Sequence, residues 1–299
     1  MATFQEATAV KIVDSHTYSA HFHSEWCVGS VPHGGYVTSC FLRVAAEHFR
    51  TTLAAQNQPH TITLHSEFLR RTQQGPALFK VRDAKLGRQT SVIHVSLTQD
   101  DREEVVSYIT NSNMNTEQGL TFETNWSLQP PPPAVDLARL VKGEEKTWAV
   151  KPNPFPKFRK VLEQVQMYLP RDGQVMGSLA DEWLHMKNDE KFTNASLGLV
   201  CDLFPALIEA LSITDKESKL YWFPTLLLNL DIKKCLPEEG VDWLFVRVRA
   251  KQIKNGRQDL EVVVLDENAD IVALSHHVAL ILPAERNTAE RRKNTGSKI

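Results

Sequence analysis

The stretch GYVTSCFLRVAAEHFRTTL, residues 35–53, sets the fold of the N-terminal half. Its apolar residues recur every three or four positions, the spacing of one helix face, at Val37, Phe41, Val44, Ala45 and Phe49. Four strand-like runs follow, separated by polar and glycine-containing turns, over 61–69, 77–86, 90–98 and 104–110. The sequence therefore predicts one long helix followed by four antiparallel strands.

The same order of elements recurs in the C-terminal half. Residues 195–211 have a helical pattern, which Pro205 should kink or split in two because proline lacks a backbone N–H. Four more strand-like runs follow, over 220–232, 243–253, 260–265 and 271–282. The tripeptide Gly-Arg-Gln stands between the second and third long strands of each half, at 87–89 and 256–258. The repeated order indicates two copies of one structural unit.

A helix with one apolar face has to bury that face, and a single antiparallel sheet can wrap around it. This arrangement is the hot-dog fold, so we expect an α+β protein with two tandem hot-dog domains. Pairing of the two sheets would remove an exposed strand edge. A β-sandwich with additional helices fits less well, because one long helix precedes each set of strands.

Prolines mark the boundary between the halves, at Pro130 to Pro133 and again at Pro152, Pro154 and Pro156. Neither a helix nor a central strand can run through such a segment. We expect a first domain over 1–115 and an extended connection over 116–160, with a short helix at 135–141. A second domain over 161–284 and a polar tail over 285–299 complete the chain.

Composition and motifs exclude several classes of function. The 299 residues carry a net charge of −2, which gives no field to attract nucleic acid. The longest apolar runs fall far short of the roughly 20 residues that a membrane span needs, and four scattered cysteines are typical of reduced thiols in an intracellular protein. Gly-x-Ser-x-Gly, a zinc-ligand spacing, a phosphate-binding glycine loop and the signature of hot-dog hydratases are all missing. We expect no cofactor and no metal.

Four short motifs resemble the acyl-CoA thioesterase II family. They are PHGGY at 32–36, LHSEFLR at 64–70, LGLVCDL at 197–203 and TLLLN at 225–229. The resemblance covers roughly 15–112 and 175–283 and leaves the proline-rich connection unmatched. It is strongest to the thioesterase-like double hot-dog proteins that are common in fungi. It implies hydrolysis of an acyl-CoA, or of a carrier-bound acyl chain, to a free acid and a thiol.

The resemblance also implies the catalytic residues. In the family an Asp on the second helix, a Thr on the next strand and a Gln on the last strand hold the attacking water. The first two positions fall on Asp202 and Thr225, and the third falls on His277, where this sequence departs from the family's Gln. Histidine can hydrogen-bond a water and transfer a proton. Asp202 would be the base, although an Asp at the solvent edge of its helix is the alternative.

The substrate side of the site is expected at the start of the first helix. His33, Gly34 and Gly35 precede or begin it, and unpaired amides at a helix N-terminus are natural donors to an oxyanion. The glycines leave room for a carbonyl, or alternatively only permit tight packing of the helix. His65, in the matching strand motif, is the fourth substrate-side candidate.

Other functions on the same fold remain open. One is a biosynthetic cyclase, lyase or acyl-transfer enzyme, suggested by His277, and another is a non-catalytic acyl-CoA-binding protein. The last three residues, Ser297, Lys298 and Ile299, are a close variant of the Ser-Lys-Leu peroxisomal address. They favour a peroxisomal role in lipid metabolism. If they are simply a disordered end, the expected location is the cytoplasm. We expect a homodimer or a larger homo-oligomer, with no nucleic acid partner.

Overall fold

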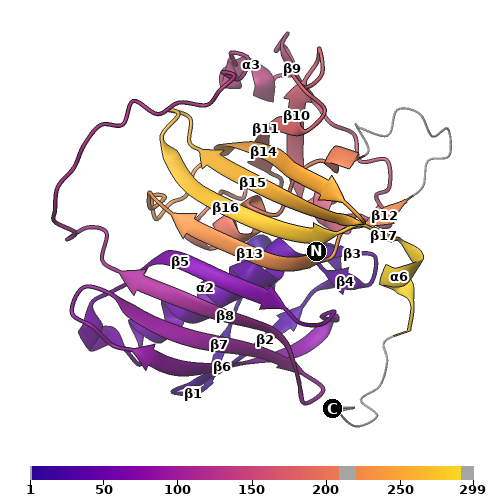
Figure 1. The fold of residues 1–299 in the computed structure, drawn as a ribbon. Coiled ribbons are helices and arrows are strands. Elements are labelled where there is room, and N and C mark those ends of the chain that lie inside the picture. Colours follow the sequence, from indigo (N-terminus) through magenta and orange to yellow (C-terminus); the bar gives the residue numbers. More distant parts are fainter. Residues whose placement is uncertain (1, 209–219, 291–299) are drawn as a thin grey trace.

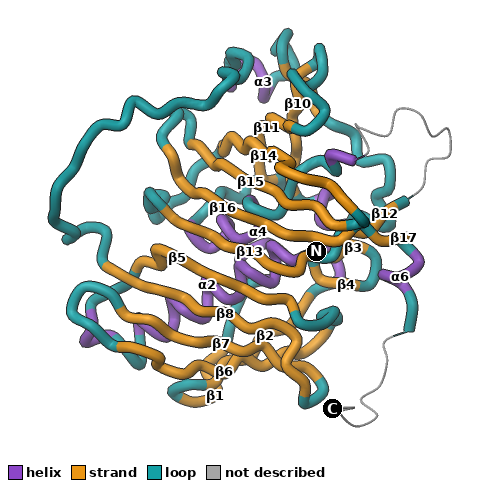
Figure 2. The backbone as a smooth tube through the Cα atoms, viewed as in Figure 1, coloured by secondary structure: helices purple, strands orange, loops and turns teal. Residues whose placement is uncertain are grey.

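The computed structural model describes residues 2–208 and 220–290 (Figure 1). One antiparallel sheet of 13 strands dominates these residues, in the order β1-β2-β6-β7-β8-β5-β13-β16-β15-β14-β11-β10-β9. The long helix α2 (Gly34–Arg50) and the short helix α4 (Leu197–Val200) lie on one side of this continuous sheet (Figure 2). Among the described residues no helix is long and apolar enough to cross a membrane. The expected α+β double hot-dog architecture is confirmed.

In the N-terminal half the predicted helix and all four strands are present. They are α2 (Gly34–Arg50), β5 (His60–Phe68), β6 (Gly75–Lys85), β7 (Ser91–Gln99) and β8 (Arg102–Ser112). The sequence did not predict the edge strand β1 (Lys11–Asp14) or its neighbour β2 (Thr17–Phe22). Strand β1 has no buried residue to create an alternating pattern. Short elements fill the rest: α1 (Phe4–Ala7), η1 (Ser24–Trp26), β3 (Cys27–Val28), β4 (Val31–Pro32) and η2 (Ala54–Gln56).

The C-terminal half contributes the other strands. The four predicted ones are β13 (Thr225–Ile232), β14 (Trp243–Lys254), β15 (Arg257–Leu265) and β16 (Ile271–Leu280). Two more, β10 (Val165–Pro170) and β11 (Leu179–Met186), were not predicted. The remaining elements are η3 (Lys160–Glu163), η4 (Asn194–Ser196), α4 (Leu197–Val200), β12 (Tyr221–Trp222), β17 (Leu282–Pro283) and α6 (Glu285–Thr288).

The long second helix expected over 195–211 is wrong. Helix α4 ends at Val200, Cys201 and Asp202 form a turn, and helical structure resumes only at 207–208, where the described residues stop. Pro205 removes a backbone donor, and the residue before a proline is pushed out of the helical region. Asp202 therefore lies just beyond a helix end and not in the middle of a helix.

The two halves are joined by direct strand pairing and by a close helix contact. Strands β5 and β13 pair antiparallel, with Leu64 opposite Leu230. Helices α2 and α4 meet where Gly198 has no Cβ, since a Cβ there would lie 2.6 Å from the backbone N of Ser39. The Ser39 hydroxyl accepts a hydrogen bond from the N–H of Leu199 at 2.9 Å. The interior is therefore shared by both halves.

The proline-rich connection does more than link the halves. It contains α3 (Leu137–Val141), close to the expected short helix, and also β9 (Trp148–Val150), which extends the sheet next to β10. Its side chains Leu128, Leu140 and Trp148 form a second apolar cluster with Trp183, Trp243 and Phe245 on the sheet face that points away from the main core. The expected extended connection is thus incomplete as a description, because this segment also covers the outer face of the C-terminal half of the sheet.

A buried ion pair holds part of the proline-rich connection against the sheet. The Arg247 guanidinium donates two hydrogen bonds to the Asp181 carboxylate, at 2.6 and 2.7 Å, and a third to the carbonyl of Pro130 at 2.6 Å. Charges on buried side chains are tolerated when they are paired in this way. The four-proline run is therefore held on the sheet by a specific contact.

The C-terminal segment is less exposed than the sequence suggested. Asn287 in α6 is fully buried, and its side chain donates to the Val28 carbonyl at 2.8 Å and accepts from the Ser30 N–H at 2.9 Å. The polar tail expected over 285–299 is therefore anchored at this position, because an asparagine side chain can satisfy backbone groups as well as water can. Ser297, Lys298 and Ile299 lie outside the described residues.

We predict that Gly198→Ala lowers the free energy of unfolding by about 1–3 kcal/mol, because the added methyl overpacks the contact between α2 and α4. Chemical denaturation of the full chain measures this. The matched control is Gly119→Ala, since a Cβ at Gly119 meets no atom within 4 Å. Equal stability of both variants and the parent protein would contradict a tight crossing at Gly198.

Candidate active site

A cavity of about 500 Å³ opens where the two halves meet. Its wall combines the start of α2, the segment after α4, and strands β13 and β16, and it includes His33, Gly34, Asp202, Thr225 and His277. Apolar and aromatic side chains form much of the remainder, among them Phe204, Trp222 and Phe223. Ligand sites in proteins are concave and mostly apolar with a few converging polar groups. This cavity has that character.

The N-terminus of α2 holds the Asp202 carboxylate. The N–H of Gly35 donates to Asp202 Oδ2 at 2.6 Å. A Cβ on Gly34 would lie 2.7 Å from Asp202 Oδ2 and 2.8 Å from Thr225 Oγ1, and a Cβ on Gly35 would lie 2.8 Å from the Cβ of Asp202. Only glycine at both positions allows the helix end to approach so closely. The two glycines therefore create the space in which Asp202 and Thr225 meet.

His277 connects the carboxylate to the threonine. Its Nε2 lies 3.2 Å from Thr225 Oγ1, within hydrogen-bond distance, and its Nδ1 lies 3.3 Å from Asp202 Oδ1. The imidazole is buried and packs edge-on against Phe204, whereas the neighbouring His276 is exposed on the other face of β16. Adjacent strand residues point to opposite faces, which separates the two histidines. Asp202, Thr225 and His277 thus form one contiguous polar group.

His33 completes this group from the opposite wall. Its Nδ1 lies 3.5 Å from Asp202 Oδ2. Although both imidazoles approach the carboxylate, neither His33 Nδ1 nor His277 Nδ1 makes a hydrogen bond within the described residues, because proximity alone does not provide hydrogen-bond alignment. Buried polar atoms without a partner are costly. Two buried imidazole nitrogens thus lie beside one carboxylate without a hydrogen-bond partner among the described residues.

Burial controls the charges of these side chains. Desolvation raises the pKa of Asp202 from 3.8 to about 7, against the lowering effect of the Gly35 hydrogen bond. Desolvation also lowers the pKa of His277 to about 3 and that of His33 to about 4. Near neutral pH both histidines are uncharged, and Asp202 sits at the midpoint of its titration. A carboxylate with a pKa near the working pH suits general base catalysis.

The other residues expected at the substrate side are placed differently. The Gly35 N–H donates to Asp202, so it holds the carboxylate and is not free to bind an oxyanion. His65 does not reach the cavity: its side chain is 46% exposed, and its Nδ1 pairs with Asn229 Oδ1 across the β5–β13 junction. Strand alternation explains this, since Leu64 and Ser66 point inward. Gly34 and the His33 imidazole remain on the cavity wall.

Sequence reasoning missed a group of basic side chains that line the same cavity. They come from the segment after β5, the connection and α6: Arg70, Arg71, Lys151, Arg159 and Arg286. The adjacent pair Arg70-Arg71 was the available signal. The others are far apart in the sequence and meet only through the fold. Cationic side chains at a cavity favour anionic ligands such as phosphates.

Two hot-dog units that share one sheet and a cavity between them place the chain in the double hot-dog class. Family models agree with this class. The acyl-CoA thioesterase N-terminal domain matches residues 22–112, and the acyl-CoA thioesterase C-terminal domain matches residues 136–281. The chain therefore belongs to the acyl-CoA thioesterase family.

One curated relative and several solved structures are similar to the chain. The thioesterase-like protein TwmA of Talaromyces wortmannii is 36% identical, with 100% of this chain and 97% of the relative covered. A thioesterase II candidate of Thermobifida fusca superposes with a TM-score of 0.74 at 19% identity, covering 94% of this chain and 98% of that one. The acyl-CoA thioesterase II TesB2 of Mycobacterium marinum gives 0.65 at 15% identity, covering 94% and 97%. These structural likenesses support the fold.

We predict that kcat/KM for thioester hydrolysis rises with pH and levels off above an apparent pKa of about 7, because Asp202 acts only when ionised. His33 and His277 stay neutral over this range and add no second step. Initial rates between pH 5 and about 9, at the low substrate concentrations that report the free enzyme, test this. A flat profile would contradict a role for Asp202 as base.

Proposed function

We propose that the protein hydrolyses an acyl thioester by a water that Asp202 activates. The observation that carries the proposal is the contact of Asp202, Thr225 and His277 at one wall of the cavity, with Nε2 of His277 3.2 Å from Thr225 Oγ1 and its Nδ1 3.3 Å from Asp202 Oδ1. The Thr225 hydroxyl and the neutral His277 orient the water, and the Asp202 carboxylate takes its proton. At the position where the family has a glutamine, this chain has His277, whose Nδ1 also lies close to the proposed base Asp202.

The reaction then follows in two balanced steps. The water oxygen bonds to the thioester carbon while its proton moves to Asp202, which gives a tetrahedral oxyanion. The oxyanion collapses, the carbon–sulfur bond breaks, and Asp202 returns the proton to the leaving thiolate. The products are a carboxylic acid and a free thiol, and the carboxylate of Asp202 is restored. An oxyanion of this kind requires hydrogen-bond donors nearby, and His33 and the Gly34 amide are our candidates.

The substrate we propose is an acyl group on CoA or on a carrier's phosphopantetheine arm. Both carriers are anionic and end in a thiol, so the basic side chains of the cavity suit them, with Arg70 and Arg71 next to one another on the chain. The apolar walls, including Phe204 and Trp222, suit the acyl chain. The anionic carrier would thus bind along the basic side chains of the cavity, and the acyl chain would bind along its apolar walls.

Asp202→Asn should remove thiol release from acyl-CoA substrates by about 10²–10⁴-fold, the usual loss for a general base. A thiol-reactive dye measures the rate. Asparagine can still accept the Gly35 hydrogen bond, and it removes a carboxyl whose raised pKa makes it destabilising as pH rises from about 4 to 7. The variant should therefore unfold no more easily than the parent at pH 8.

Asp172→Asn, an exposed change in a turn, is the matched control. Unchanged turnover in Asp202→Asn would refute the proposal.

The competing reading is a hot-dog lyase, cyclase or acyl-transfer enzyme, or an acyl-CoA-binding protein without turnover. His277 motivates it, because an imidazole beside Asp202 could serve acid–base chemistry other than hydrolysis. We predict that His277→Gln, which restores the family residue, keeps or raises thiol release, and that His276→Ala leaves it unchanged. Loss of all activity in His277→Gln, with substrate binding retained, would favour the competing reading.

We further propose peroxisomal delivery through Ser297, Lys298 and Ile299, and assembly as a homodimer or larger. Acyl-CoA substrates are consistent with that compartment and with lipid metabolism. A fusion with a fluorescent protein at the N-terminus should be punctate, and deletion of the last three residues should make it diffuse. Diffuse signal from the intact tail would contradict the peroxisomal part, and a sedimentation mass equal to the 33.8 kDa chain would contradict the assembly.

A further inference from the structure

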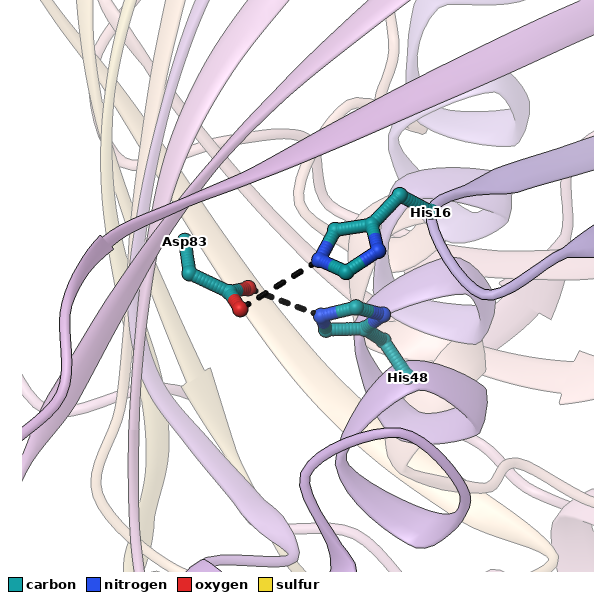
Figure 3. Close-up of side chains that lie close together, drawn as sticks. All are labelled: His16, His48 and Asp83. Carbon is teal, nitrogen blue, oxygen red and sulfur yellow. Dashed lines mark hydrogen bonds and ion pairs between the residues drawn. The ribbon is translucent and has the colours of Figure 1, made fainter.

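A second polar cluster lies at the opposite end of α2 from the candidate active site. It consists of His16 in the turn between β1 and β2, His48 in the last turn of α2, and Asp83 on β6 (Figure 3). His48 Nε2 lies 2.9 Å from Asp83 Oδ1, and His16 Nε2 lies 3.3 Å from Asp83 Oδ2. Fifteen residues of helix at 1.5 Å each separate His33 from His48, so the two sites are roughly 20 Å apart.

Both imidazoles are oriented from behind by hydroxyl groups. His48 Nδ1 lies 2.9 Å from the Tyr18 hydroxyl, and His16 Nδ1 lies 2.9 Å from the Ser15 hydroxyl. The two Nε2 atoms therefore both point at one carboxylate, as Figure 3 shows. Ligands of metal ions typically have their second ring nitrogen hydrogen-bonded in this way, which fixes the tautomer and the ring orientation.

The spacing of these atoms fits a small tetrahedral ion. The three candidate ligand atoms lie within 4.8 Å of one another. Around a zinc ion with bonds of about 2.0–2.1 Å, ligand atoms are separated by roughly 3.3 Å. Here His48 Nε2 lies 2.9 Å from Asp83 Oδ1, and His16 Nε2 lies 3.3 Å from the other oxygen, Oδ2. Two imidazoles and one carboxylate are a common zinc donor set, with water as the fourth ligand.

Burial allows such an ion to bind and leaves it accessible. The His48 side chain is fully buried, Asp83 is 24% exposed and His16 is 42% exposed. The ion would thus enter from the His16 side and rest against a fixed imidazole. The Asp83 carboxylate lies between the two imidazoles, so all three side chains present an atom to the same small volume.

We propose that His16, His48 and Asp83 bind one zinc ion, which fastens the β1–β2 turn to α2 and β6. Such an ion would stabilise the edge of the sheet at β1. Strand β1 ends the sheet, all four of its residues are exposed, and within the described part of the chain it pairs with β2 alone. Its apolar side chains Ile12 and Val13 are 51% and 58% exposed and add little packing. A metal bond at the turn would hold this edge where packing does not.

The test uses the full-length protein after removal of metals with a chelator. Titration with ZnCl₂ should show one tight site per chain, and CoCl₂ should give the visible bands of tetrahedral Co²⁺. A hundredfold excess of Zn²⁺ over its dissociation constant should raise the unfolding midpoint by about 5 °C. His16→Ala, an exposed change that leaves the helix intact, should weaken binding at least about 100-fold and abolish the thermal shift. Asp83→Asn should do the same.

His276→Ala is the matched control, since it removes an exposed histidine outside the cluster and should bind zinc like the parent protein. Absence of tight zinc binding in the parent protein would overturn the proposal. Equal binding by His16→Ala would overturn it as well, because the ion would then lie elsewhere, for example among His33, His277 and Asp202. In that case the cluster is a hydrogen-bonded network of Tyr18, His48, Asp83 and His16 and nothing more.

Discussion

The structure depends on the close approach of the N-terminus of α2 to the turn after α4. Gly34 and Gly35 make this approach possible, because a Cβ on either would lie within 3 Å of Asp202 or Thr225 atoms. The Gly35 N–H then donates to the carboxylate at 2.6 Å. This contact brings the first half of the chain against the second at the same point where the polar residues meet. The site is therefore shared between halves, although its three candidate catalytic side chains all come from the second.

The same approach sets the chemistry of Asp202. A helix N-terminus stabilises a negative charge, whereas burial destabilises it, and burial has the larger effect. The result is a carboxyl group that is half ionised near neutral pH and flanked by two imidazoles that burial keeps neutral. Folding tolerates this cost because the surrounding core is extensive and continuous across both halves. Functional sites commonly retain such unfavourable groups, which the rest of the fold has to offset.

The two halves have the same architecture but different surroundings. In the second half, the proline-rich connection covers the outer face of the sheet through Trp148 and its neighbours, and the Arg247–Asp181 pair holds the four-proline run in place. In the first half Tyr108 on the outer face is half exposed, and the sheet ends in strand β1, whose four residues are all exposed. Among the described residues, the β9 edge of the sheet thus belongs to the well-packed connection, whereas the β1 edge lies beside the His16, His48 and Asp83 cluster.

The sequence by itself determined the two helix-plus-sheet units, their order, eight of the long strands and the short helix in the connection. Local periodicity and turn residues carry that information, and the motifs around Gly34, Asp202, Thr225 and His277 pointed to the cavity. It misplaced Asp202 within a long helix, because the helical pattern outweighed the effect of Pro205, and it grouped His65 with residues on the opposite face. Strand alternation and the family motif already selected His277 over His276. Tertiary structure alone decided that His277 contacts both Asp202 and Thr225, where Arg70, Arg159 and Arg286 converge, and that His16 meets Asp83. These relations join residues far apart in the chain, and no local pattern encodes the pairing of strands and helices that brings them together.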